Sequence, residues 1–378
     1  MTTVAPSSAR FTAQVLRNRL RRAAAEAAGR GIDALLITPS PDYAYLLGYR
    51  APAMERLTCL IVPADGMPAL VVPRLEEPLA RHELDELTGD LELVAWGETD
   101  DPIDLVRSLV GGAMRVAVQD QMWARFALRL RAVLDPAQVV EAGPTMSALR
   151  SVKEPEEIER LRRAASAADV AMTGILGERL SGRTEAEVSS RIRELLLEVG
   201  HETADFGIVA SGPNAASPHH APGDRVIGEG DAIVLDIGGT LGGYASDTSR
   251  TAFVGDPPAD FAALYQVLRD AQSAACAAAV AGISGAELDA VARTIIAEAG
   301  YGDAFLHRTG HGIGLETHEE PYVVASNTEP LVPGNAFSVE PGIYIRDQWG
   351  ARIEDIVVCT AAGPERLNTT STELAIVD

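Results

Sequence analysis

The sequence is almost devoid of lysine: Lys153 is the single one among 32 Lys and Arg residues. A P-loop uses a lysine to bind phosphate, and a Schiff-base enzyme uses one as its nucleophile. Lys153 lies in the segment SVKEPEE, with no glycine-rich loop beside it. The sequence therefore argues against both classes of protein.

Cysteines are also scarce, and Cys59, Cys276 and Cys359 are far apart in the chain without a C-x-x-C pair. Such spacing favours neither a disulfide framework nor a zinc–thiolate site, and it is typical of a reducing compartment. The chain also lacks an apolar run of about 18 residues, and its first ten residues lack the apolar core of a signal peptide. We therefore expect a cytoplasmic protein that has no membrane partner.

Positive charge is in deficit, because 54 Asp and Glu residues outnumber 32 Lys and Arg residues and give a net charge of −22. Nucleic acids and anionic membranes bind clustered positive charge, so this balance argues against both as partners. It suits a protein that gathers carboxylates around cations. The length of 378 residues predicts two domains.

The first domain is expected over residues 1–145. A helical stretch over 16–28 precedes short apolar segments at 33–37, 60–62 and 70–72, with proline and glycine between them. This alternation predicts an α/β unit, and it contains no reactive cluster of side chains. A boundary near Ala142-Gly143-Pro144 leaves residues 146–378 as the second domain.

The second domain contains an internal repeat, in segments 181–200 and 281–300. Each begins with a capping box, Thr184 with Glu187 in one and Ser284 with Glu287 in the other. Each continues as an amphipathic helix and ends at a glycine. A longer helical segment precedes each copy, at 155–177 and at about 258–280. The repeat predicts two related α+β halves around a shared sheet, with a site between them.

Two carboxylates follow the first copy of the repeat. Asp236 ends the apolar run AIVL, and Asp247 lies in YASDTS beyond the segment GGTLGG. If GGTLGG turns the chain back, a hairpin brings the two carboxylates together in a mostly buried place. They repel each other there unless one is protonated or a cation lies between them.

Three further segments carry chemically active side chains: HRTGHGIGLETHEEPY with His311 and His318, FSVEPGIYI with Glu340, and GARIEDIVV with Glu354 inside a strand. Strand alternation places Arg352 on the same face as Glu354. Each residue alone has an ordinary structural interpretation as a turn carboxylate, an ion pair or a loop histidine. The ordered set of four carboxylates and one imidazole predicts a site for two divalent ions. Two such ions can share a hydroxide and polarise a carbonyl.

The order D…D…H…E…E, in the contexts LDIGG, SDTSRT, GHGIGLETHE, EPGIY and RIED, resembles the M24 metallopeptidases of the pita-bread fold. The sequence is most similar to Xaa-Pro dipeptidases (prolidases) and aminopeptidase P, over nearly the whole chain. The resemblance implies an α+β protein with a creatinase-like α/β N-terminal domain. A C-terminal pita-bread catalytic domain with internal pseudo-symmetry would follow it.

The resemblance also implies roles for individual residues. Five of them would bind metal, with Asp247 and Glu354 each bridging two ions: Asp236, Asp247, His311, Glu340 and Glu354. Three would act in catalysis, namely Glu340 as general base and His219 and His318 as substrate-contacting histidines. His220 is the alternative to His219. Arg352 would orient ligands or bind a substrate carboxylate, and Tyr344 would line a proline pocket.

The implied activity is hydrolysis of the bond before proline, in Xaa-Pro dipeptides or at peptide N-termini, through a metal-bridging hydroxide. The implied cofactors are two divalent ions, manganese first, with cobalt or zinc as alternatives. The partner is a small peptide, and relatives of this kind suggest a homodimer. Aminopeptidase P activity on longer peptides, or hydrolysis of another small amide, remains an alternative. A metal-free pseudoenzyme that acts as a binding module is an alternative of another class.

Overall fold

The computed structural model describes residues 10–378, and its contacts divide the chain into two compact units that meet between Arg150 and Ser151. The predicted domain boundary, between residues 145 and 146, falls inside helix α6 (Gly143–Arg150) of the first unit. No helix in the described residues combines the length and apolar character that crossing a bilayer requires.

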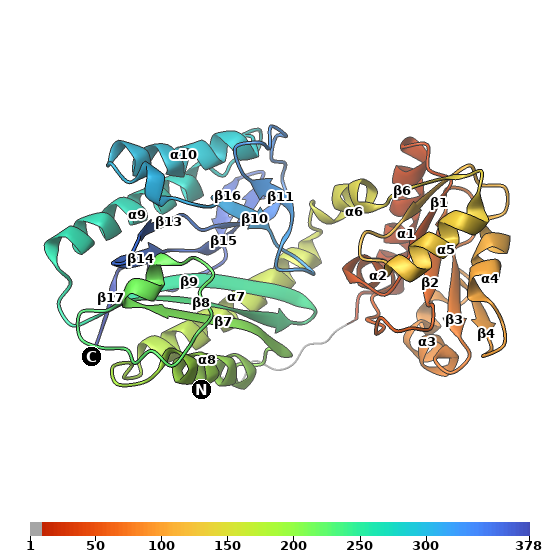
Figure 1. The fold of residues 1–378 in the computed structure, drawn as a ribbon. Coiled ribbons are helices and arrows are strands. Elements are labelled where there is room, and N and C mark those ends of the chain that lie inside the picture. The colour runs from red at the N-terminus through yellow and green to blue at the C-terminus, as the bar shows by residue number, and fades with distance from the viewer. Residues whose placement is uncertain (1–9) are drawn as a thin grey trace. The chain divides into compact units, whose positions relative to one another are not determined.

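The N-terminal unit is a six-stranded sheet in the order β4-β3-β2-β1-β5-β6, with helices packed on it (Figure 1). All four residues of β1 are buried, which requires cover on both faces of the sheet. The strands are β1 (Ala34–Ile37), β2 (Cys59–Pro63), β3 (Ala69–Pro73), β4 (Glu92–Trp96), β5 (Arg115–Val118) and β6 (Gln138–Glu141). The helices before α6 are α1 (Ala13–Gly29), α2 (Pro41–Leu47), α3 (Glu77–Glu83), the short η1 (Asp85–Leu87), α4 (Pro102–Val110) and α5 (Ala124–Leu134).

The C-terminal unit contains a four-stranded sheet in the order β17-β9-β8-β7, a five-stranded sheet in the order β11-β10-β12-β15-β16, and the ribbon β13-β14. The first sheet consists of β7 (Thr203–Ser211), β8 (Ala232–Leu241), β9 (Tyr244–Val254) and β17 (Ala375–Val377). The second sheet and the ribbon consist of β10 (Gly310–Gly312), β11 (Glu319–Val323), β12 (Ala336–Val339), β13 (Gly342–Ile345), β14 (Trp349–Arg352), β15 (Asp355–Thr360) and β16 (Gly363–Arg366).

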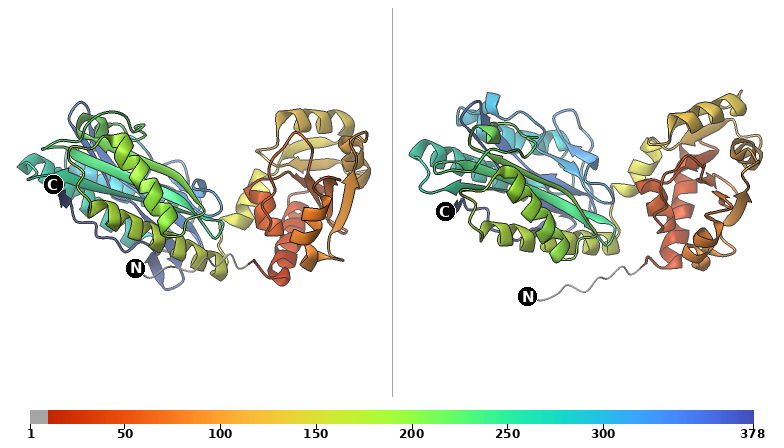
Figure 2. Two further views of the ribbon diagram at one scale, coloured as in Figure 1. Left: turned by 90° about the horizontal axis from the view of Figure 1, so that it is seen from below. Right: turned by 60° about the horizontal axis from the view of Figure 1, so that its bottom comes forward.

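Two pairs of helices cover these sheets. Figure 2 shows α7 (Pro155–Leu176) and α8 (Glu185–Glu198) against the strands of the first sheet, and their apolar faces share one core with it. The other pair, α9 (Ala259–Ala278) and α10 (Gly285–Glu298), shares a second core with β12, β13 and β15. The short helices η2 (Gly212–Ala216) and η3 (Gly302–Ala304) complete the unit. Mixed helix and sheet in two cores agree with the predicted α+β class.

Both predicted capping boxes are present. The hydroxyls of Thr184 and Ser284 accept hydrogen bonds from the backbone N–H of Glu187 and Glu287, at 3.1 and 3.2 Å. Each glutamate accepts in return from the backbone N–H of its capping residue. These short-range signals, each inside one helical turn, are enough to start α8 and α10 where the sequence predicted.

The hairpin of β8 and β9 turns at Gly242 and Gly243, whose φ angles are 60° and 79°. The predicted reversal within GGTLGG is present, although the first four residues of the segment belong to β8 and the last two form the turn. The first glycine, Gly238, is needed for close packing instead: a Cβ there would lie 2.4 Å from the Ser246 carbonyl oxygen.

Candidate active site

The hairpin brings Asp236 and Asp247 to the same face of the first sheet. Asp236 pairs with Ser249 and Asp247 pairs with Gly238, so the two aspartates are diagonal neighbours across β8 and β9. Asp247 is almost completely buried, with 4% of its surface exposed. The predicted convergence of these carboxylates is therefore present in the structure.

The second half of the unit supplies three more of the predicted ligands. His311 is the middle residue of β10, and Glu340 follows β12 directly. Glu354 does not lie inside a continuous strand as expected, because β14 ends at Arg352 and β15 begins at Asp355. At this break Glu354 forms an isolated bridge with Ser249 of β9, and the bridge brings it to the hairpin.

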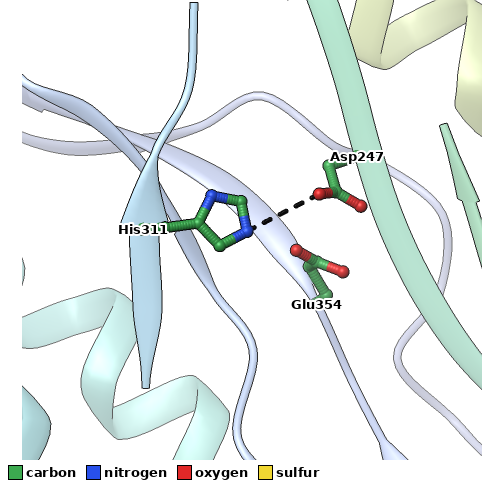
Figure 3. A group of neighbouring side chains, drawn as sticks. All are labelled: Asp247, His311 and Glu354. Atoms are coloured by element: carbon green, nitrogen blue, oxygen red, sulfur yellow. Dashed lines mark ion pairs between the residues drawn. The ribbon is translucent and has the colours of Figure 1, made fainter. Parts of the chain in front are cut away.

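Asp247, His311 and Glu354 point toward one another, with one potential ligand atom of each within 4.8 Å of the others (Figure 3). His311 Nε2 lies 3.7 Å from Asp247 Oδ2 and 3.2 Å from Glu340 Oε1. All five predicted metal ligands line one cavity of about 590 Å³. That volume is within the ~300–1,000 Å³ typical of small-molecule sites.

The buried carboxylates carry a strong electrostatic penalty. Burial, followed by the charges of neighbouring carboxylates, raises the pKa of Asp247 and of Glu354 well above the usual values. Within the described part of the chain, Asp236 Oδ1 and Glu354 Oε1 have no hydrogen-bond partner although both atoms are buried. Native proteins rarely leave buried carboxylate oxygens without a donor. Oxygen ligands with one imidazole fit divalent metal ions, so these residues fit a metal site.

The pKa of Glu340 is shifted in the opposite direction to those of Asp247 and Glu354. Burial raises the pKa of Glu340, but the hydrogen bond from His311 and the nearby charges of His311, His307 and Arg352 lower it to about 2. Its Oε1 also accepts a hydrogen bond from the Ser338 hydroxyl at 3.1 Å. Glu340 therefore keeps its negative charge inside a cluster that penalises other carboxylates.

Arg352 is enclosed by hydrogen-bond acceptors. Its Nη2 donates to Asp236 Oδ2 at 2.7 Å, and its Nε donates to the Ser249 hydroxyl at 2.9 Å. Its Nη1 donates to the Pro218 carbonyl at 3.2 Å and to the Tyr344 hydroxyl at 2.9 Å. Every guanidinium nitrogen is thus engaged with the protein, and the contact with Asp236 orients that carboxylate toward the cavity.

Tyr344 lies behind Arg352, and it is absent from the residues that line the cavity. Its hydroxyl lies between Arg352 Nη1 and His307 Nε2, the latter at 2.8 Å. Burial raises the pKa of Tyr344 to about 12, so the phenol keeps its proton at neutral pH. The structure therefore places this residue where it supports the arginine.

Of the predicted histidines, His219 and His318 both line the cavity. The His318 ring lies against the His311 ring, with centroids 4.1 Å apart and planes at 87°. Burial and the charges of His311 and Arg308 lower the pKa of His318 to about 4, so it is neutral at pH 7.

The alternative histidine, His220, is placed elsewhere. It is absent from the cavity lining and makes a 2.8 Å hydrogen bond to Glu185. Glu185 is fully buried and also accepts hydrogen bonds from Ser211 and Asn214, so it fixes the loop that carries His219.

Sequence reasoning missed six residues that line the cavity: Phe206, Ile208, Pro218, His307, Arg308 and Thr317. The last three lie inside or beside the motif around His311 and His318, so their proximity to it was a usable signal. Phe206 and Ile208 belong to β7, where they pair with Gly238 and Asp236 of β8. No local pattern in the sequence indicates that pairing.

Known proteins share this architecture. The chain matches metallopeptidase family M24 over residues 159–361 and the creatinase/prolidase N-terminal domain over residues 19–152. A crystal structure of dipeptidase PepE from Mycobacterium ulcerans has a TM-score of 0.93 and 45% identity, covering 97% of this chain and 99% of that one.

Two more distant structures share the fold. An Xaa-Pro dipeptidase from Bacillus anthracis has a TM-score of 0.87 and 32% identity, over 97% of this chain and 100% of that one. An X-Pro aminopeptidase from Thermotoga maritima has a TM-score of 0.80 and 30% identity, over 92% and 98%. These matches confirm the predicted fold and the metallo-exopeptidase class. With a creatinase-like N-terminal unit and a pita-bread C-terminal unit, the chain belongs to metallopeptidase family M24.

Proposed function

We propose that the protein is an Xaa-Pro dipeptidase, which hydrolyses the bond before proline with the help of two divalent ions. The observation that carries the proposal is a pair of buried oxygens without a donor, Asp236 Oδ1 and Glu354 Oε1, on residues that line the cavity. A cation is the natural partner for such atoms, because no described donor reaches them. The similarity to enzymes named dipeptidase supports the substrate class.

The metal ions would be held by the five side chains predicted from the sequence: Asp236, Asp247, His311, Glu340 and Glu354. The mutual approach of the ligand atoms of Asp247, His311 and Glu354 supports this assignment. Manganese is our first choice of ion, with cobalt or zinc as alternatives. When bound, divalent ions of this kind polarise the scissile carbonyl and lower the pKa of the attacking water.

The side chains of the protein supply the remaining functions. We assign Glu340 to accept the proton of the attacking water, because its carboxylate lines the cavity beside His311. His318 would donate an N–H to the negative charge that develops on the carbonyl oxygen. His219 would contact the substrate from the loop that Glu185 fixes. Arg352 would hold the Asp236 carboxylate in position to bind a metal ion.

A bond before proline suits this arrangement. Proline lacks an amide hydrogen and restricts the residue before it, so enzymes that hold the scissile amide by that hydrogen bind such substrates poorly. The donors assigned here act on the carbonyl side of the bond. No step requires the missing hydrogen.

Metal analysis and two substrates test the proposal. The purified protein is expected to bind two transition ions per chain and, with added manganese, to hydrolyse Gly-Pro faster than Gly-Pro-Ala. A preference for Gly-Pro-Ala would instead favour aminopeptidase P activity. Hydrolysis of neither peptide, with full metal, would point to another small amide as substrate. Less than one ion per chain would favour a metal-free binding module.

We further propose that the protein is cytoplasmic and homodimeric. The three cysteines form no disulfide in the structure, which is compatible with a reducing compartment. Light scattering of the purified protein tests the oligomeric state, because a dimer has twice the 39.9 kDa mass of one chain.

A further inference from the structure

Arg308 differs from Arg352, the other arginine that lines the cavity. Its side chain is only partly buried, and no described carboxylate or carbonyl accepts a hydrogen bond from its guanidinium. Arg352 is engaged through all its nitrogens with groups of the protein. The cavity therefore contains one arginine that is already bonded and one that is available for a ligand.

An aromatic ring holds the available guanidinium in place. The Arg308 Cζ lies 4.3 Å from the centroid of the Tyr322 ring, in β11. A stacked guanidinium gains a cation–π attraction while its N–H groups point outward from the edges of its plane. Tyr322 thus positions the charge and leaves the hydrogen-bond donors free.

The backbone around Arg308 is fixed on both sides. Asp289 accepts hydrogen bonds from the N–H and hydroxyl of Thr309 at 3.0 and 2.8 Å. Arg293 donates to the His307 carbonyl at 2.8 Å. Arg308 therefore projects from a segment that is ordered before any substrate binds, which reduces the entropy lost on binding.

The arginines that line the cavity, among the described residues, are Arg308 and Arg352. Among the described residues of the cavity, Arg308 is the one arginine without an acceptor. A free carboxylate entering the cavity would find bidentate donors there.

We propose that Arg308 binds the C-terminal carboxylate of the substrate, and so makes the enzyme select dipeptides over longer peptides. The inference rests on the proposed Xaa-Pro dipeptidase function and deepens it. The sequence had suggested Arg352 as a possible carboxylate ligand, but the contacts of Arg352 leave that role to Arg308. In a dipeptide the carboxylate is next to the scissile bond, whereas an added residue moves it away.

The test combines an enzyme variant with a substrate variant. Wild type and Arg308→Gln are assayed with Ala-Pro, which has the free carboxylate, and with Ala-Pro amide, which lacks it. We expect Arg308→Gln to lower kcat/KM for Ala-Pro about 10- to 100-fold, mainly through KM, and to leave the amide unaffected. Exposed Arg346 provides the matched control, because Arg346→Gln removes an arginine of the same unit outside the cavity.

Binding of the product supplies a second readout. Calorimetry with L-proline is expected to give a Kd that rises in Arg308→Gln by a similar factor. Tyr322→Leu, which removes the ring but keeps Arg308, is expected to cause a smaller loss that is again confined to the free carboxylate.

The outcomes separate two kinds of failure. If wild type hydrolyses both substrates and Arg308→Gln slows both equally or neither, the inference is overturned and the dipeptidase function stands. If wild type with manganese hydrolyses neither, the proposed function fails, and the inference fails with it.

Discussion

Replacing Asp247 by asparagine should separate the metal-binding role of this carboxylate from any role in folding. Asp247 lies on β9 with one oxygen close to ligand atoms of His311 and Glu354. Burial and three neighbouring carboxylates raise its pKa, so its charge opposes folding when no cation is present. Asparagine keeps the shape of the side chain, and the hairpin is held by backbone pairing of β8 with β9. The metal-free variant should therefore be at least as stable as the metal-free wild type.

Metal binding should then distinguish the two proteins. Manganese at about 100 times its Kd adds about 2.7 kcal/mol to the stability of a protein that binds it only when folded. For a unit the size of residues 151–378, about 2–4 °C per kcal/mol gives a rise in Tm of about 5–10 °C. We expect this rise in wild type and its loss in Asp247→Asn, together with loss of turnover.

Differential scanning calorimetry with and without manganese, with metal analysis of the same samples, measures both effects. Asp256→Asn is the control, because Asp256 is an exposed aspartate of the same unit. An Asp247→Asn protein that gains as much stability from manganese as wild type would refute the reasoning. A metal-free variant that melts well below metal-free wild type would show that Asp247 has a structural role instead.

Three further perturbations test the surroundings of the cavity. His318→Ala should lower kcat about 100-fold without changing the metal content, as expected for a lost donor to the carbonyl oxygen; an unchanged kcat would exclude that role. Lys153→Met should reduce the free energy of unfolding by about 3–5 kcal/mol in urea titrations, because it leaves the buried carboxylate of Glu319 without its ammonium partner; a stability equal to wild type would contradict this. Burial lowers the pKa of His201 in the folded protein, so the unfolded chain binds more protons and stability falls as the pH drops below about 6.5. His201→Gln should flatten this decline, measured as Tm between pH 7 and 5.5, and an equally steep decline in the variant would count against it.

The parts of the fold that the sequence predicted depend on short-range interactions. The boxes at Thr184 and Ser284 each join residues three positions apart, inside one turn of helix. The run before Asp236 forms a buried strand because its consecutive apolar residues require cover on both faces. The sequence did not show which residues of GGTLGG form the turn, because its glycines have different roles. Gly238 allows a close approach of the neighbouring strand, whereas Gly242 adopts the positive φ of the turn.

The sequence likewise predicted some features of the candidate site and not others. Carboxylates at strand ends and glycines around His311 predicted which residue types would gather. The sequence did not predict that Arg352 would be enclosed by acceptors, or that Tyr344 would lie behind it. It also did not predict that β7 would form a wall of the cavity.

The sequence by itself determined the helices of the internal repeat, their caps, and the set of side chains able to bind a cation. Only the tertiary structure decided which of those side chains are already bonded and which remain available, as the contrast between Arg352 and Arg308 shows. The physical reason is separation along the chain. Lys153 meets Glu319 across 166 positions, and Glu354 meets Ser249 across 105. Such contacts depend on the register of two sheets and the packing of two helix pairs, which no local pattern encodes.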